Sequence, residues 1–217
     1  MRQPIARIPA MHVRHCWVVM LLLAPLPALA GCPPFDWIDH VVTYDDSGIW
    51  NRDYQKDLAA AAALTVIGGA LFTDNNSRIG RTFDQTFDSM ILTAGTTTAM
   101  KYVFSRERPS QNADPCDFFD GSGHQSFPSG EVAEISSIVT PFILEYGHDH
   151  PAVYALAVLP VYDAIARVKV HGHWQSDVLV GAGIGVAWGF YAHHRKTPLI
   201  LGLLPDGGVM LGYHKEF

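Results

Sequence analysis

Cysteine, charge and long apolar runs are all scarce in this sequence. The 217 residues include three cysteines, and only 17% are charged. No CxxC pair or ladder of Cys and His occurs, so nothing supports a zinc site, and a formal charge of −6 disfavours binding to nucleic acid through its phosphates. After residue 31 the apolar runs last about 14 to 16 residues, whereas a bilayer-spanning helix needs roughly 20. These runs predict core helices of a soluble bundle, and leave close association with a membrane face open.

The first 31 residues have the pattern of an export signal. Three arginines and no acidic residue precede the short apolar run "WVVMLLLAPLPALAGC", which ends in small residues. Without those arginines the chain has 15 − 3 = 12 basic and 21 acidic residues, a mature charge of −9. We therefore predict a signal peptide over 1–31, an irregular arm over 32–56 and one folded domain over 57–217.

The end of this signal can be interpreted in two ways. "ALA" at 28–30 suits ordinary cleavage after Ala30, whereas "LAGC" at 29–32 resembles the lipobox of bacterial lipoproteins, in which Cys32 carries lipid. A lipidated Cys32 would leave Cys116 without an intrachain partner, and a free Cys32 could pair with Cys116 in an oxidising periplasm. We favour a periplasmic, membrane-anchored lipoprotein.

The rest of the chain predicts an all-α, single-domain helical bundle. Its helices are expected over 57–72, 82–108, 130–146, 151–169 and 175–194. Pro109 should end the second of these, and Ser176 is a plausible N-cap for the last. The tail alternates apolar and other residues around an Asp-Gly-Gly turn, which predicts a small hairpin.

Three short stretches contain residues that suit phosphate chemistry. In "KYVFSRERP", Lys101 and Arg108 are seven residues apart, so on one helix they would point the same way, roughly 10 Å apart along the axis. In "FPSGE", Ser129 and Gly130 stand where a loop becomes a helix, and free amides at a helix start favour an anion. Alone, the first stretch is typical of a solvated basic face and the second of an ordinary N-cap.

The third stretch, "ARVKVHGHWQSD", adds a possible nucleophile. Arg167 precedes His173, and Asp177 follows four residues later, where its carboxylate can accept the imidazole N–H and fix the tautomer. Such a pair is often structural. Together, however, three cations, an anion-holding turn and an oriented histidine are the parts needed for phosphoryl transfer through a phosphohistidine.

The three motifs in this order, K-x6-R-P, P-S-G and R-x5-H-x3-D, resemble the type 2 phosphatidic acid phosphatase superfamily. That superfamily also contains bacterial non-specific acid phosphatases and shares its site with vanadium haloperoxidases. The resemblance implies an all-α bundle with the site between helix ends. It implies that phosphate is held by Lys101, Arg108, Arg167, Ser129 and Gly130. It also implies that His173 is the nucleophile and Asp177 its partner, with no cofactor or metal.

Two positions depart from the family pattern. Ala166 replaces a supporting serine, and Glu131 stands where the family has the histidine that protonates the leaving oxygen. Glu131 could be the general acid itself if burial raises its pKa, which would favour mildly acidic pH. Alternatively His124 or His171 supplies the proton, or Glu131 pairs with Arg108 or Arg167 and blocks the site.

These observations predict an exported, metal-independent phosphatase that hydrolyses phosphomonoesters. A membrane-tethered enzyme would meet lipid phosphates, although small periplasmic esters are an equal alternative. Two other functions remain open: a phosphate- or lipid-binding lipoprotein that has lost catalysis, and a vanadate-dependent peroxidase. No nucleic-acid partner is expected.

Overall fold

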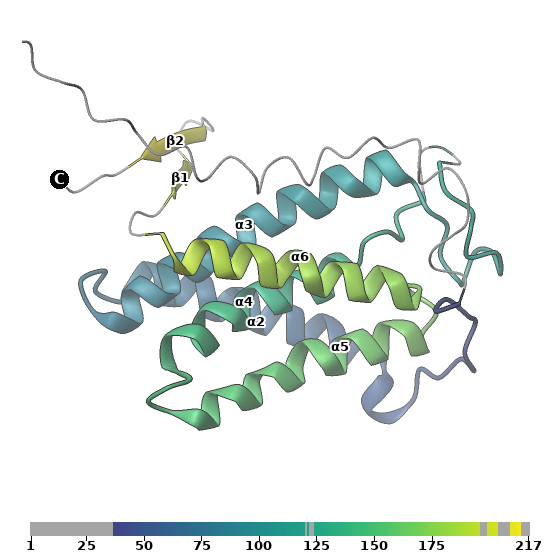
Figure 1. Ribbon diagram of the computed structural model, residues 1–217, viewed down its shortest axis with the longest axis horizontal. Helices are drawn as coiled ribbons and strands as arrows, with labels where there is room; N and C mark the ends of the chain where they lie inside the picture. Colours follow the sequence, from purple (N-terminus) through teal and green to yellow (C-terminus); the bar gives the residue numbers. More distant parts are fainter. Residues whose placement is uncertain (1–36, 120, 122–123, 196–198, 204–208, 214–217) are drawn as a thin grey trace, which may run out of the picture. The chain divides into compact units, whose positions relative to one another are not determined.

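The computed structural model describes residues 37–119, 121, 124–195, 199–203 and 209–213. The chain divides into Met1–Pro33, which lies outside the described residues, and one unit, Pro34–Phe217. The predicted signal peptide and Cys32 therefore lie outside the described residues. Figure 1 shows the arrangement of the helices.

The predicted all-α class is confirmed. The helices are α2 (Arg52–Phe72), α3 (Arg78–Phe104), α4 (Gly130–Tyr146), α5 (Val158–Lys169) and α6 (Gln175–His193). Two 3-10 helices, η3 (Gly48–Trp50) and η4 (Pro151–Ala157), precede α2 and α5. The predicted hairpin is present as β1 (Leu199–Leu203) paired antiparallel with β2 (Val209–Tyr213).

Local chemistry explains where the helix bounds differ from those expected. Helix α2 begins at Arg52 rather than 57, because the side chain of Asn51 accepts a hydrogen bond from the Asp53 amide. Helix α3 ends at Phe104 rather than near Pro109, since Ser105 adopts a left-handed conformation with φ 41°. The prediction that Lys101 and Arg108 share one helix face is therefore wrong, because Arg108 lies in the following loop.

The start of α6 also corrects the sequence prediction. Its N-cap is Trp174, not Ser176, and the Trp174 amide donates to Asp177 Oδ2 at 2.9 Å. The Ser176 amide donates to Asp39 Oδ1 at 2.7 Å. Two carboxylates thus accept hydrogen bonds from the amides that begin this helix, as the positive end of a helix dipole favours.

The interior of the bundle is small and polar rather than strongly apolar. Helix α4 packs against α3 and α6, and a methyl group on Gly185 of α6 would lie 2.0 Å from the Ala133 carbonyl oxygen of α4. Backbones this close leave no room for large side chains. Between α3 and α4 the buried contacts include hydroxyl groups, such as Ser89, which donates to the Ser137 carbonyl at 2.9 Å.

The large apolar side chains of α5 lie outside this interior. Val158, Val161 and Ile165 are 63%, 57% and 45% exposed. The expectation that the apolar run over 151–169 forms a buried core helix is therefore wrong, because the close packing of α4 and α6 leaves its apolar side chains on the outer surface.

Candidate functional site

Helix ends bring the three sequence motifs together. The Ser129 amide, at the start of α4, donates to the Asp177 carbonyl of α6 at 2.9 Å. A methyl group on Gly130 would lie 3.6 Å from Cε of Lys101, so the lysine from the end of α3 crosses the start of α4. The P-S-G turn is therefore fixed between the first and third motifs.

His173 is buried beside Asp177, in the arrangement its spacing predicts. Nδ1 of His173 lies 3.5 Å from Asp177 Oδ2, and the histidine is 3% exposed. Burial is the main reason that the pKa of His173 falls to about 3, although the nearby Asp177 opposes this change. The imidazole is consequently neutral across the physiological range, and its Nε2 is the nitrogen directed away from Asp177.

The carboxylate of Asp177 accepts several hydrogen bonds in addition to its contact with His173. It accepts hydrogen bonds from the Ser126 hydroxyl, from the Trp174 amide at 2.9 Å and from Arg106 at 2.6 Å. Burial alone would raise its pKa, but hydrogen bonding and the charge of Arg106 outweigh burial, so the pKa is lowered. Asp177 thus remains ionised, as a group that orients a neutral imidazole requires.

Arg106 and Asp39 belong to the hydrogen-bond network around Asp177, and sequence analysis missed both of them. The Arg106 guanidinium is 1% exposed and also donates to Asp39 Oδ2 at 2.7 Å and to the Ser176 hydroxyl at 2.8 Å. Its central carbon lies 4.6 Å from the centre of the Phe118 ring. One buried arginine therefore links the N-terminal arm, the loop after α3 and the start of α6. The sequence signal that could have identified Arg106 is its position two residues before Arg108.

Lys101 and Arg108 supply positive charge beside the histidine. Burial, followed by the charge of Arg108, lowers the pKa of Lys101 to about 8. Nζ of Lys101 donates to the Gln125 carbonyl at 2.6 Å. Among the described residues, none accepts a hydrogen bond from the guanidinium of Arg108, whose pKa is lowered by burial and by the charge of Arg52. Both groups thus retain donors for an anionic ligand.

Arg167 is positioned by a glycine. Its guanidinium is buried, and a methyl group on Gly172 would lie 2.5 Å from one of its terminal nitrogens. Asp163, one helical turn earlier, is fully buried, and neither of its carboxylate oxygens has a hydrogen-bond partner among the described residues. Arg167 therefore lies in a narrow space that any side chain larger than hydrogen at residue 172 would fill. The buried carboxylate of Asp163 lies one helical turn before it on α5.

At Ser129 the side-chain hydroxyl, and not the backbone amide, is available to an anionic ligand. The residue is fully buried, its amide is used by Asp177, and its Oγ has no hydrogen-bond partner within the described part of the chain. A buried hydroxyl without a partner is costly, so a ligand that hydrogen-bonds to it is favoured. Ser129 is thus suited to the anion contact that the sequence assigns to it.

Glu131 lies in the site but is already paired. Arg52, from the start of α2, donates two hydrogen bonds to its carboxylate, one of them 2.6 Å long. Arg167 Nε lies 3.8 Å from the same carboxylate. Burial would raise the pKa of Glu131, but the bonds from Arg52 and the charge of Arg167 outweigh it, so the pKa is lowered. Among the three sequence interpretations, the geometry favours ion pairing, with Arg52 as the unpredicted partner.

The two alternative histidines have other contacts. His171 Nε2 lies 2.7 Å from the Val42 carbonyl, and its ring packs edge-on to Tyr44. His124 Nδ1 lies 3.4 Å from a carboxylate oxygen of Glu107. His171 therefore faces the N-terminal arm. His124, together with Lys101, lines a cavity of 300 Å³ that opens beside the site.

These features define a helical bundle with a buried histidine–aspartate pair close to the cationic side chains of Lys101, Arg108 and Arg167. The chain belongs to the PAP2 superfamily, whose pattern matches residues 87–199. It is 38% identical over 102 residues to the lipid A 1-phosphatase of Porphyromonas gingivalis, covering 46% of this chain and 20% of that protein. The chain thus spans about a fifth of the length of this curated relative.

A solved structure has the same fold. The crystal structure of Aquifex aeolicus LpxE superposes with a TM-score of 0.51 at 19% identity. The match covers 71% of this chain and 100% of that one. The helical arrangement that brings the motifs together is therefore shared with that protein.

Proposed function

We propose that this chain is a phosphatase that releases phosphate from a phosphomonoester, with a lipid phosphate as the substrate class. The observation that carries the proposal is the buried His173–Asp177 pair, surrounded by Lys101, Arg108 and Arg167. The matching segment of a lipid A 1-phosphatase supports the substrate class.

The reaction proceeds in two displacements at phosphorus. Nε2 of His173 attacks in line, so that an N–P bond forms while the bond to the leaving oxygen breaks. The three cations and the Ser129 hydroxyl stabilise the charge on the equatorial oxygens. Water then attacks phosphorus, the N–P bond breaks, and inorganic phosphate leaves while the imidazole returns to its neutral form. The cations provide the neutralisation for which metal ions serve in other phosphatases.

Protonation of the leaving oxygen is the step in which this chain differs from its family. Glu131 is ionised and held by Arg52, so it is a poor proton donor at neutral pH. We assign it instead a positioning role, in which it holds Arg52 beside the site and faces Arg167. The departing oxygen then takes its proton from water. Such a site suits an acidic leaving group, as in a sugar 1-phosphate, whose ring oxygen withdraws electron density from the departing oxygen.

Loss of catalysis is the second candidate function, and one observation favours it. The Glu131 carboxylate is near Arg167, where it competes with an incoming phosphate. In that case the protein would bind phosphate or lipid weakly without turnover.

One experiment separates these functions. Phosphate release would be measured for the wild type and His173→Ala, with a lipid phosphate in mixed micelles and with p-nitrophenyl phosphate. We expect wild-type turnover of both substrates, at least about 1,000-fold faster than the variant, since the nucleophile is lost. Alkaline quenching should trap the phosphohistidine in the wild type only. Equal rates in the two proteins would refute the proposal and favour the binding function.

Export and the lipid anchor form a separate part of the proposal. Cys116 is disulfide-bonded. A bond between Cys116 and Cys32 would exclude a lipid on Cys32, so finding that bond in the mature protein would support cleavage after Ala30 over the lipobox. Mass spectrometry of the mature N-terminal peptide distinguishes a diacylglyceryl group on Cys32 from a disulfide.

A further inference from the structure

We propose that the N-terminal arm positions the nucleophile of the candidate site. We call residues 39–45 of the arm the strap, and residues 169–176, which run from the end of α5 to the first turn of α6, the histidine loop. The strap lies along the histidine loop, which contains His173. Asp39 and His171 are the positioning residues, because they act on this loop rather than on phosphate. The kinetic part of the proposal rests on the proposed phosphatase function, whereas docking of the strap does not.

Asp39 binds the end of the histidine loop. Its carboxylate is fully enclosed and accepts hydrogen bonds from the Ser176 amide at 2.7 Å, from the Ser176 hydroxyl at 2.6 Å and from Arg106 at 2.7 Å. Arg106 also donates to Asp177 at 2.6 Å, and Asp177 lies beside Nδ1 of His173. A carboxylate of the strap is therefore connected to the nucleophile through two buried charged groups.

Further hydrogen bonds hold the strap along the same loop. The His40 amide donates to Gln175 Oε1 at 3.1 Å, and Gln175 Nε2 donates to the His40 carbonyl at 2.9 Å. At the other end of the strap, the Asp45 amide donates to the Lys169 carbonyl at 3.0 Å. The strap is thus bonded to the chain both before and after His173, and such second contacts hold a reactive side chain in place.

The backbone of His171 shows why the histidine loop needs this support. Its φ is 53°, a left-handed conformation that glycine adopts without cost and other residues avoid. Nε2 of His171 lies 2.7 Å from the Val42 carbonyl, and its ring packs edge-on to Tyr44 with the ring centres 5.3 Å apart. Two residues of the strap therefore hold a strained residue that lies two positions before the nucleophile.

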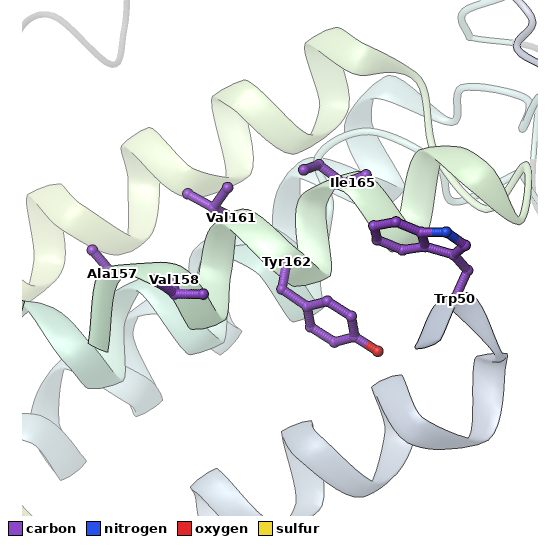
Figure 2. Close-up of a pocket in the computed structure, with 6 residues that line it drawn as sticks. All are labelled: Trp50, Ala157, Val158, Val161, Tyr162 and Ile165. Atoms are coloured by element: carbon purple, nitrogen blue, oxygen red, sulfur yellow. The ribbon is translucent and has the colours of Figure 1, made fainter. Parts of the chain in front are cut away.

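The segment that follows the strap is fixed to α5. Trp50 of η3 stacks on Tyr162 with the ring centres 6.0 Å apart, and both rings border a cavity of 410 Å³ (Figure 2). The Tyr162 hydroxyl donates to the Ile49 carbonyl, and Nζ of Lys169 lies 5.8 Å from the centre of the Trp50 ring. The strap is consequently held at both ends, by Asp39 at the start of α6 and by η3 on α5.

The position of the histidine loop matters for the chemical step. In-line attack requires Nε2 of His173 to face phosphorus, and a displacement of about 1 Å at a reacting group can lower the rate about 100-fold. Phosphate binding depends less on the strap, because Lys101 lies in α3 and Arg167 in α5, outside the histidine loop. Loosening the strap should therefore lower kcat more than it changes KM.

Hydrogen exchange tests the docking of the strap in the full chain and needs no turnover. In Asp39→Asn, peptides that cover 169–176 should exchange at least about tenfold faster than in the wild type, because the amide side chain repels the donors around it. Peptides from 135–144 in α4 should keep their rates. Asp53→Asn is the matched control, since that carboxylate is 78% exposed at the start of α2.

Two outcomes of the exchange experiment bear directly on the strap. Equal exchange of 169–176 in the wild type and Asp39→Asn would overturn the proposal. If every peptide of Asp39→Asn exchanges faster, the same comparison with Gln175→Ala decides, because that variant removes only the two bonds to His40 and leaves no charge buried.

Steady-state kinetics on p-nitrophenyl phosphate test the consequence for the nucleophile. Per folded molecule, Asp39→Asn should lose at least about tenfold in kcat with KM within about twofold of the wild type, and Asp53→Asn should change neither. A loss that only matches the loss of folded protein would overturn the positioning role. If the wild type and His173→Ala release phosphate equally, the proposed function fails, and the exchange result alone decides whether the strap docks.

Two substitutions of His171 provide the sharpest comparison. His171→Ala and His171→Gly both remove the ring that contacts the strap, but only glycine adopts the left-handed φ without cost. We expect kcat to fall at least about tenfold in His171→Ala and to be at least about threefold higher in His171→Gly than in His171→Ala. Equal kcat in the two variants would overturn the role of the strap in holding a strained loop, and is the result expected if the imidazole donated a proton.

Discussion

The two charged ends of the bundle use the same residue types in different surroundings. At the site end, Arg106 is 1% exposed and holds Asp39 and Asp177, both fully enclosed. At the opposite end, Arg78 is 41% exposed and binds Glu145 and Asp149. Water screens the ion pairs of Arg78 but not those of Arg106. The buried pairs of Arg106 should therefore matter far more to the stability of the protein.

This difference shows how the fold prepares a reactive group. Asp177 orients His173 only if it stays ionised in a buried place, and Arg106 provides the compensating charge. The pairs at the opposite end join Arg78 of α3 to Glu145 of α4 and to Asp149 in the loop that follows. Burial, rather than the number of charges, therefore distinguishes the site end.

The largest expected effect is on stability and comes from Arg106. Arg106→Met should lower the free energy of unfolding by about 3–5 kcal/mol, because two buried carboxylates lose their cation. Arg78→Met is the matched control and should leave the unfolding midpoint almost unchanged. Thermal unfolding of both variants under one set of conditions provides the measurement. Equal destabilisation would remove the distinction between the two ends.

Two glycines extend the comparison to activity. Gly172→Ala should lower kcat/KM roughly 10- to 100-fold, because the new methyl group displaces the guanidinium of Arg167 from phosphate. Gly147→Ala, at the opposite end, would place a methyl group 2.5 Å from the Ile143 carbonyl. That variant should lose stability and keep its activity per folded molecule. A Gly172→Ala enzyme with wild-type kcat/KM would show that Arg167 does not bind the substrate.

Much of the fold follows from sequence because helix signals are local. The bounds of α4 agree with the prediction at both ends, since a Gly-initiated turn and a Gly-His-Asp break enclose it. Which helix surfaces are buried and which are exposed does not follow from sequence in this way. A run such as 151–162 has the same composition whether it faces the core or the outer surface, and only the folded chain shows that this segment is mostly uncovered.

The site follows from sequence where spacing fixes geometry. His173 and Asp177 are four residues apart across the N-cap of α6, so their approach is a local property. Arg52 lies 79 residues before its partner Glu131, and Asp39 lies 67 before Arg106. No local pattern predicts contacts over such separations, because they depend on how whole helices pack.

A smaller effect should appear in the pH dependence of the site. Because burial lowers the pKa of Lys101 to about 8, the lysine loses its proton, and its attraction for phosphate, above that pH. We expect kcat/KM to fall up to tenfold per pH unit above about pH 8. In Lys101→Arg this decline should be absent below pH 10, since a guanidinium stays protonated. An unchanged profile in Lys101→Arg would assign the decline to another group.

The smallest expected effect is the change in turnover caused by substitution of Glu131. Its dependence on the leaving group distinguishes a positioning role from a proton-donating role. If Glu131 positions Arg52 without donating a proton, Glu131→Gln should reduce turnover of p-nitrophenyl phosphate and of an alkyl phosphate by a similar, small factor. The amide can still accept a hydrogen bond from Arg52, and the poorer leaving group gains nothing from a carboxylate that is already ionised. Glu145→Gln, which alters the corresponding pair with Arg78, should change neither rate.

The ratio of the turnover rates on the alkyl phosphate and on p-nitrophenyl phosphate therefore shows whether Glu131 donates a proton. A general acid matters most when the departing oxygen is strongly basic, so a much greater loss on the alkyl phosphate would establish Glu131 as the proton donor. Glu131→His places the family's histidine at this position, and under our assignment it should raise the alkyl phosphate rate relative to that of p-nitrophenyl phosphate. If the ratio does not move in either variant, protonation of the leaving oxygen does not limit the reaction.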